Sequence, residues 1–116
     1  MRFEDTLVPA RDHPTCHIFG YDDVTPLCIS EGHGHIVHLS PTRAIERHVN
    51  GSIELFADFL VIYEKCRREV VGLDDRSVDE LIDRVEAQMG SADPSAVEEP
   101  EFYWSVILEQ MRDGLL

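Results

Sequence analysis

The hydrophobic pattern changes its period at Asn50–Gly51, and this change constrains the fold more than any other feature of the sequence. Before this point, apolar residues occur in three short β-prone runs, Cys16–Tyr21, Leu27–Ser30 and His35–Leu39. After it, they recur with the spacing of helices that bury one side. Strands followed by helices predict an α+β fold, with the helices packed on one face of an antiparallel sheet.

The three β-prone runs are separated by tight turns. Asp22–Asp23 ends the first run, and Glu31–Gly34 separates the second from the third. Short strands joined in this way predict an antiparallel meander over residues 16–40. Residues 1–15 are mixed in character and contain two prolines, which indicates an irregular or edge segment.

The second half of the sequence, residues 50–114, predicts three helices with recognisable ends. Ser52 is suited to cap the first helix with its hydroxyl, and Gly72 is its expected stop. Ser77–Glu80 fits a capping box at the start of the second helix, which is expected to stop at Gly90. Pro100 suits the first position of the last helix, which is apolar from Phe102 to Met111.

The charge balance restricts the kinds of partner that the chain can bind. Ten Lys and Arg residues face 23 Asp and Glu residues, which gives a formal net charge of −13. Such a field repels nucleic acid and anionic membranes and attracts a basic partner. The segment 74–101 is especially acidic, with arginine only at Arg76 and Arg84.

Length and targeting signals predict one cytoplasmic domain over residues 1–116. A chain of 116 residues has the size of a single core, and no apolar run approaches the roughly 20 residues that span a bilayer. The first five residues include two acids, whereas a signal peptide starts with basic residues and an apolar stretch.

Six histidines and three cysteines raise the alternative of a small metal-binding protein or enzyme. If Gly32–Gly34 is a three-residue hairpin loop, Cys28 lies opposite His38, and His33 and His35 are close by. Thiolate and imidazole are ligands that zinc prefers. Against this, the chain lacks the spacings of known zinc sites, of nucleophilic hydrolases and of phosphate-binding loops. We therefore expect no metal, no cofactor and no catalytic residues.

The order of several motifs resembles the SUKH superfamily, and most closely its fourth family of bacterial immunity proteins. The motifs are Ile18–Asp23, the strand Leu27–Ser30, the turn and strand Gly34–Leu39, the block Val49–Leu60 and the segment Phe102–Gly114. The resemblance covers residues 16–114, and the Asn50–Leu60 block is its most specific part. Members usually carry a helix and a Gly-Leu-Pro-like segment near the N-terminus, and neither precedes Cys16. We therefore expect a sheet that lacks an element or borrows one from a partner.

The resemblance implies a protein that neutralises a polymorphic toxin, often a nuclease or a nucleic-acid deaminase, by binding it without catalysis. The matched positions imply structural roles as a turn, a cap and core anchors, at Gly20, Asn50, Ser52, Phe56 and Trp104. A generic regulatory interaction module of the same fold is the remaining alternative. An exposed sheet edge also allows a homodimer.

The acidic charge predicts the contacts with a basic toxin. Carboxylates that occupy or cover a nucleic-acid cleft would act as a mimic of the polyanion. The expected contacts lie in the first turn and along the second predicted helix, at Asp22, Asp23, Asp74, Asp75, Asp79 and Asp83.

Overall fold

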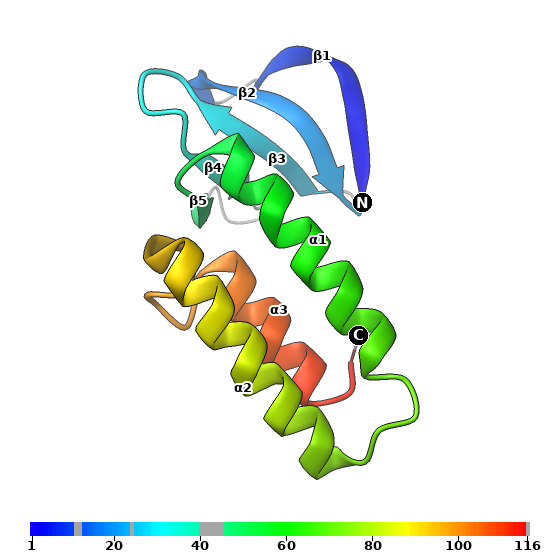
Figure 1. Ribbon diagram of the computed structural model, residues 1–116. Helices are drawn as coiled ribbons and strands as arrows, with labels where there is room; N and C mark the ends of the chain where they lie inside the picture. Colours follow the sequence, from blue (N-terminus) through cyan, green and yellow to red (C-terminus); the bar gives the residue numbers. More distant parts are fainter. Residues whose placement is uncertain (11–12, 24, 40–45, 116) are drawn as a thin grey trace.

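The residues that the structure describes form five strands followed by three α-helices, which confirms the predicted α+β fold (Figure 1). The computed structural model describes residues 1–10, 13–23, 25–39 and 46–115. The strands are β1 (Arg2–Ala10), β2 (His13–Asp22), β3 (Thr25–Ser30), β4 (Ile36–Leu39) and β5 (Glu46–Asn50). The helices are α1 (Ile53–Glu69), α2 (Asp75–Ala92), the short 3₁₀ helix η1 (Pro94–Ala96) and α3 (Tyr103–Arg112).

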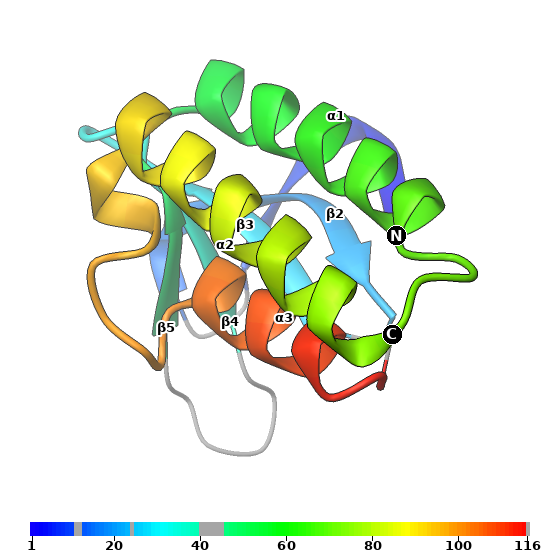
Figure 2. The same ribbon diagram turned by 60° about the horizontal axis from the view of Figure 1, so that its bottom comes forward.

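The strands form one antiparallel sheet in the order β1-β2-β3-β4-β5, which is a simple meander. The helices lie together on one face of this sheet (Figure 2). The far ends of the helices extend beyond the sheet (Figure 1). Among the described residues, none of the helices has both the length and the apolar character needed to cross a membrane.

The sheet has one strand that the sequence did not predict, β5, and one that it left open, β1. The expected irregular or edge segment, residues 1–15, contributes the edge strand β1 and the first residues of β2, so the sheet has a strand where a missing or borrowed element was expected. Two acids and Pro9 obscure the strand pattern of β1, but an edge strand tolerates both. Strand β5 has the sequence Glu-Arg-His-Val-Asn, which is too polar to be recognised from its period. Residue 40, the expected end of the meander, lies outside the described residues.

The β3–β4 hairpin has a longer loop than expected, and this changes its register. The amide of Ser30 donates to the carbonyl of His35 at 2.8 Å, which leaves a four-residue loop. Cys28 therefore pairs with Val37, and His38 pairs with Leu27, not with Cys28. A shift of one residue moves side chains to the opposite face of a sheet, so the expected Cys28–His38 pair does not form.

The helix ends agree only partly with the predictions. The Ser52 hydroxyl caps α1 by accepting the Leu55 amide at 3.2 Å, as predicted. The predicted capping box at Ser77 is wrong, because Asp74 caps α2 and accepts the Ser77 amide at 2.8 Å. Helix α2 also continues past Gly90, and α3 starts at Tyr103 rather than at Pro100.

The main core lies between the sheet and the helices. Its largest fully buried side chains include Trp104, Phe56 and Phe59, which pack against Phe19 and Leu27 from the sheet. A smaller buried cluster lies on the opposite face of the sheet and consists of Ala10, Cys16, Cys28, Val37 and Leu39. The core therefore depends on the first and the last elements of the chain together.

Candidate functional site

A buried polar network joins β5, the α2–α3 connection and α3. The indole of Trp104 donates to the Asn50 side-chain oxygen at 2.8 Å, and the Asn50 amide donates to Asp93 at 3.0 Å. The Gly51 amide also donates to Asp93, at 2.9 Å. Asn50 and Asp93 are the two buried polar or charged residues among those described. These bonds satisfy groups that would be costly to bury unpaired, which gives Asn50 and Trp104 a structural explanation.

The same network contains a histidine, a serine and an aspartate, a set that also occurs in hydrolases. Ser95 donates to Asp93 at 2.7 Å, and His48 Nε2 lies 2.9 Å from the Ser95 oxygen. In a hydrolytic triad the histidine lies between the serine and the acid, whereas here the serine lies between the other two. This order does not activate the serine, and the network instead connects β5 to the segment after α2.

Two groups of this network have shifted pKa values. Burial lowers the pKa of His48, so its ring is neutral near pH 7. Burial alone would raise the pKa of Asp93, but its hydrogen bonds from Ser95, Gly51 and Asn50 outweigh burial and lower it. A neutral imidazole and an ionised carboxylate are therefore the forms that the fold stabilises.

The structure separates the six predicted contact acids into two groups. Asp22 ends β2, and its carboxylate accepts the Tyr103 hydroxyl at 2.6 Å. Asp23 follows it in the turn, exposed and with a positive φ of 58°. The other four acids run from the N-cap of α2, Asp74, to the middle of this helix, Asp83, and the helix starts at the end of the molecule that lies away from the sheet (Figure 1).

The α2 acids form a row around one arginine. Arg112, at the end of α3, lies 2.7 Å from Asp83 and 3.9 Å from Asp79 and from Glu86. Asp74 serves as the cap of α2, and its hydrogen bonds from Ser77 lower its pKa. Asp75 is exposed and shows no ion pair or side-chain hydrogen bond within the described ranges. Three of the four acids therefore interact within the chain, since Asp74 caps α2 and both Asp79 and Asp83 pair with Arg112. The row nevertheless carries more negative than positive charge.

A groove of about 770 Å³ runs beside this row, between the α1–α2 turn and the end of α3. We call it the acidic groove. Its apolar lining is Val70, Val71, Leu73, Val78 and Met111, and its charged lining is Asp75, Asp79, Glu109, Asp113 and Arg112. Val71 is 79% exposed and Leu73 is 43% exposed, so the apolar part of the groove is open to solvent. An apolar centre surrounded by charge is the usual arrangement of a protein–protein contact.

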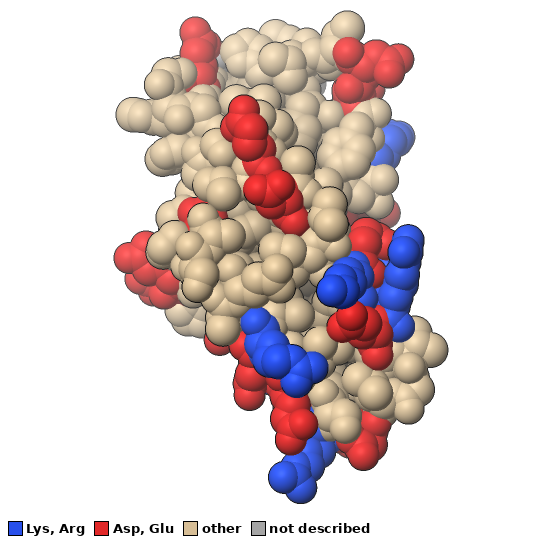
Figure 3. Space-filling model, in the orientation of Figure 1, with Lys and Arg blue, Asp and Glu red and all other residues tan. Residues whose placement is uncertain are grey.

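The remaining surface shows less charge segregation than the net charge suggests. Over α1 and α2 the space-filling view shows Lys and Arg side chains among the acids (Figure 3). Many of these are local ion pairs, such as Arg67 with Glu64 at 3.2 Å and Arg76 with Glu80 at 3.4 Å. The lining of the acidic groove, by contrast, has one cation, Arg112, against the four carboxylates of Asp75, Asp79, Glu109 and Asp113.

The alternative metal site is not assembled. His33 and His35 lie near each other, with ring centroids 5.6 Å apart, and both are exposed. Cys28 is fully buried in the cluster on the far face of the sheet. The described part of the chain contains no group of three His, Cys, Asp or Glu side chains placed to hold a metal ion.

A comparison with protein-family models matches the chain to the SUKH-4 immunity protein family over residues 3–110. The chain belongs to the SUKH-4 immunity protein family. The searches of curated proteins and of solved structures gave no match. The SUKH-4 match begins within β1, so it includes the strand that the sequence resemblance over residues 16–114 left out. Membership suggests an immunity function and a toxin as the partner.

Sequence reasoning missed the apolar part of the acidic groove in this SUKH-4 protein. Val70 and Val71 precede Gly72, and Leu73 follows it, immediately before the acidic tract. A turn that places three large apolar residues next to a row of acids could have been recognised as a contact surface. The expected site contained only the charges.

Proposed function

We propose that the protein is an immunity protein that binds a cognate bacterial toxin and blocks it without catalysis. The observation that carries this proposal is the acidic groove, where exposed Val71 and Leu73 lie beside Asp75 and Asp79. Apolar side chains supply affinity when they are buried, and the surrounding carboxylates select a basic partner. The family match supports the same function.

We further propose that the toxin acts on nucleic acid, as a nuclease or a deaminase. Such an enzyme needs a basic cleft for its polyanionic substrate. A protein with a net charge of −13 would be attracted to that cleft over distances comparable to the Debye length. The immunity protein would act in the cytoplasm, before the toxin reaches nucleic acid.

Protection of cells tests this function directly. A toxin gene that is found beside the gene of this protein is expressed from an inducible promoter, with and without the immunity protein. We expect survival only when the protein is present, and a stable complex of the two purified proteins. Death in both cases, or protection without any complex, would contradict the proposal.

Homodimer formation through β1 is a separate proposal. This edge strand exposes Phe3, Leu7 and Val8, each more than 40% accessible. An exposed edge with apolar side chains can pair with a second copy of itself. Sedimentation velocity should then show a dimer that Leu7→Lys converts to a monomer, whereas a monomeric wild type would exclude it.

A further inference from the structure

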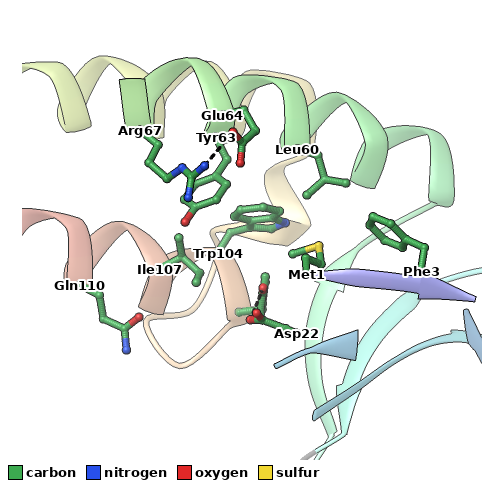
Figure 4. A pocket seen from close by; sticks show the side chains of 11 residues that line it. Met1, Phe3, Asp22, Leu60, Tyr63, Glu64, Arg67, Trp104, Ile107 and Gln110 are labelled. Atoms are coloured by element: carbon green, nitrogen blue, oxygen red, sulfur yellow. Dashed lines mark hydrogen bonds and ion pairs between the residues drawn. The ribbon is translucent and has the colours of Figure 1, made fainter. Parts of the chain in front are cut away.

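A second pocket, of about 460 Å³, lies where α1 and α3 meet β1 and the end of β2. We call it the sheet-end pocket. Figure 4 shows α1 above it, α3 beside it, and Phe3 of β1 at its edge, together with Met1, which precedes that strand. Its lining is chiefly aromatic and aliphatic, and includes Tyr63, Tyr103, Trp104, Leu60 and Ile107.

Asp22 places a carboxylate in this pocket in a fixed position. The Tyr103 hydroxyl donates to Asp22 at 2.6 Å. Burial, together with the hydrogen bond to Asp22, raises the pKa of Tyr103 well above its usual range, so this hydroxyl stays a donor at physiological pH. A hydrogen-bonded carboxylate against buried rings is an acceptor whose orientation is set before any partner arrives.

The charge of Asp22 is not neutralised by a neighbour. The other pocket carboxylate, Glu64, already accepts from Arg67 at 3.2 Å, as the dashed line in Figure 4 shows. Within the part of the chain that the structure describes, Asp22 pairs with no lysine or arginine. His38 is close enough to interact with it, but burial lowers the pKa of His38 and keeps the ring neutral near pH 7.

We propose that the sheet-end pocket binds an arginine side chain of the toxin, with its guanidinium on Asp22. The methylene stem would lie along Leu60 and Ile107, and the planar head could stack on an aromatic ring while it donates to the carboxylate. A purely apolar side chain would bury the Asp22 charge without compensation, which is unfavourable. This inference rests on the proposed function, because it names the chemistry of one toxin contact.

Small probes test the pocket in the full-length protein without a toxin. Nitrogen-15-labelled protein is titrated with N-acetyl-arginine methylamide and with the corresponding citrulline compound, which has the same shape but no charge. We expect saturable shifts of the Trp104 indole and the Tyr103 amide with the arginine probe, and about tenfold weaker binding of citrulline. Equal binding of the two probes, or no shift at these residues, would overturn the inference.

Asp22→Asn is the informative variant, and Asp58→Asn is its matched control. The first should remove the preference for arginine over citrulline, while the second removes an exposed carboxylate of α1 that does not line the pocket and should leave the preference unchanged. The same variants are then compared in toxin binding, where Asp22→Asn should be at least tenfold weaker than Asp58→Asn. If both variants bind equally, the pocket inference is wrong although toxin binding stands. If the wild type fails to bind the toxin, the proposed function is wrong whatever the probes show.

Discussion

At the scale of single residues, Trp104 joins the two halves of the chain. Its ring lies 5.7 Å from Phe59 and 6.3 Å from Phe56, measured between centroids, and it is 1% exposed. Its indole N–H also donates a hydrogen bond to the side-chain oxygen of Asn50, a residue of β5. The residue therefore contributes both apolar burial and a buried hydrogen bond across the sheet–helix junction.

Truncation of Trp104 should be severely destabilising. We expect Trp104→Ala to lower the free energy of unfolding by about 3–5 kcal/mol, as is typical when a buried large aromatic is lost. Trp104→Phe keeps most of the ring but leaves the Asn50 oxygen unsatisfied, so its cost should be about 1–3 kcal/mol. Denaturant unfolding measures both. A wild-type stability for the alanine variant would contradict this account of the core.

Two histidines should make the protein less stable in mild acid. Burial lowers the pKa of both His38 and His48 below the ordinary value of 6.5. The unfolded chain then binds protons that the folded chain does not, so stability is complete above pH 6.5 and falls as the pH drops toward the folded-state values. We expect the melting temperature to decrease from pH 7.5 to 5. His48→Gln should flatten part of this decrease, and an unchanged slope in that variant would show that His48 does not contribute.

At the scale of elements, β1 depends on a close approach at Gly20. Gly20 lies inside β2, not in the turn that the sequence resemblance implied, and it pairs with Phe3. A Cβ atom there would lie 2.7 Å from the Arg2 carbonyl oxygen and 2.8 Å from the Phe3 ring. Contacts this short are not tolerated, so only glycine allows the two strands to approach in this way.

Gly20→Ala should therefore loosen β1 selectively. We expect a loss of about 1–3 kcal/mol and faster amide exchange in β1 than in β3 and β4. Gly90→Ala is the control, because a Cβ there makes only an ordinary 3.6 Å contact with Val97 and alanine favours the helix. That control should be neutral or stabilising. Slow amide exchange of β1 in the Gly20→Ala variant would contradict this prediction, because β1 would then form without the close contact at Gly20.

The elements also show what a single sequence can predict here. The three central strands and α1 have regular periods and clear end signals, so the fold class and most bounds could be predicted. Strands β1 and β5 are edge strands without a regular alternation of apolar and polar residues, so no local pattern in the sequence predicts their pairing. The predicted start of α2 at Ser77 is wrong because Asp74 and Ser77 are both suitable N-caps, and only the folded chain selects Asp74. The sheet-end pocket combines Asp22 with residues of α1 and α3 about 40 to 90 positions later in the chain, a grouping that only the tertiary structure provides.

At the scale of the whole molecule, the acidic groove and the sheet-end pocket follow one another along α1 and α3. Tyr63 and Arg67 line the pocket, and Val70 and Val71 of the same polypeptide stretch line the groove. Ile107 and Gln110 line the pocket, and Arg112 lines the groove. One partner could therefore contact both the groove and the pocket. The electrostatic field would speed its association, and burial of the apolar side chains would slow its dissociation.

The association rate with the toxin, measured against salt concentration, tests the central claim most directly. Three proteins are compared: the wild type, a groove variant with Asp74, Asp75, Asp79 and Asp83 changed to Asn, and a control variant with Asp58→Asn and Glu98, Glu99 and Glu101→Gln. The variants lose the same charge, the control acids are exposed, and asparagine at position 74 still caps α2.

We expect the wild-type association rate to fall steeply between low and physiological salt, where screening shortens the field to about 8 Å. The groove variant should associate more slowly, with a smaller effect on dissociation, because Arg112 loses two of its three acidic neighbours, Asp79 and Asp83, and adds repulsion toward a basic toxin. The control variant should stay close to the wild type. A salt-independent wild-type rate, or equal slowing in both variants, would contradict binding through the acidic groove.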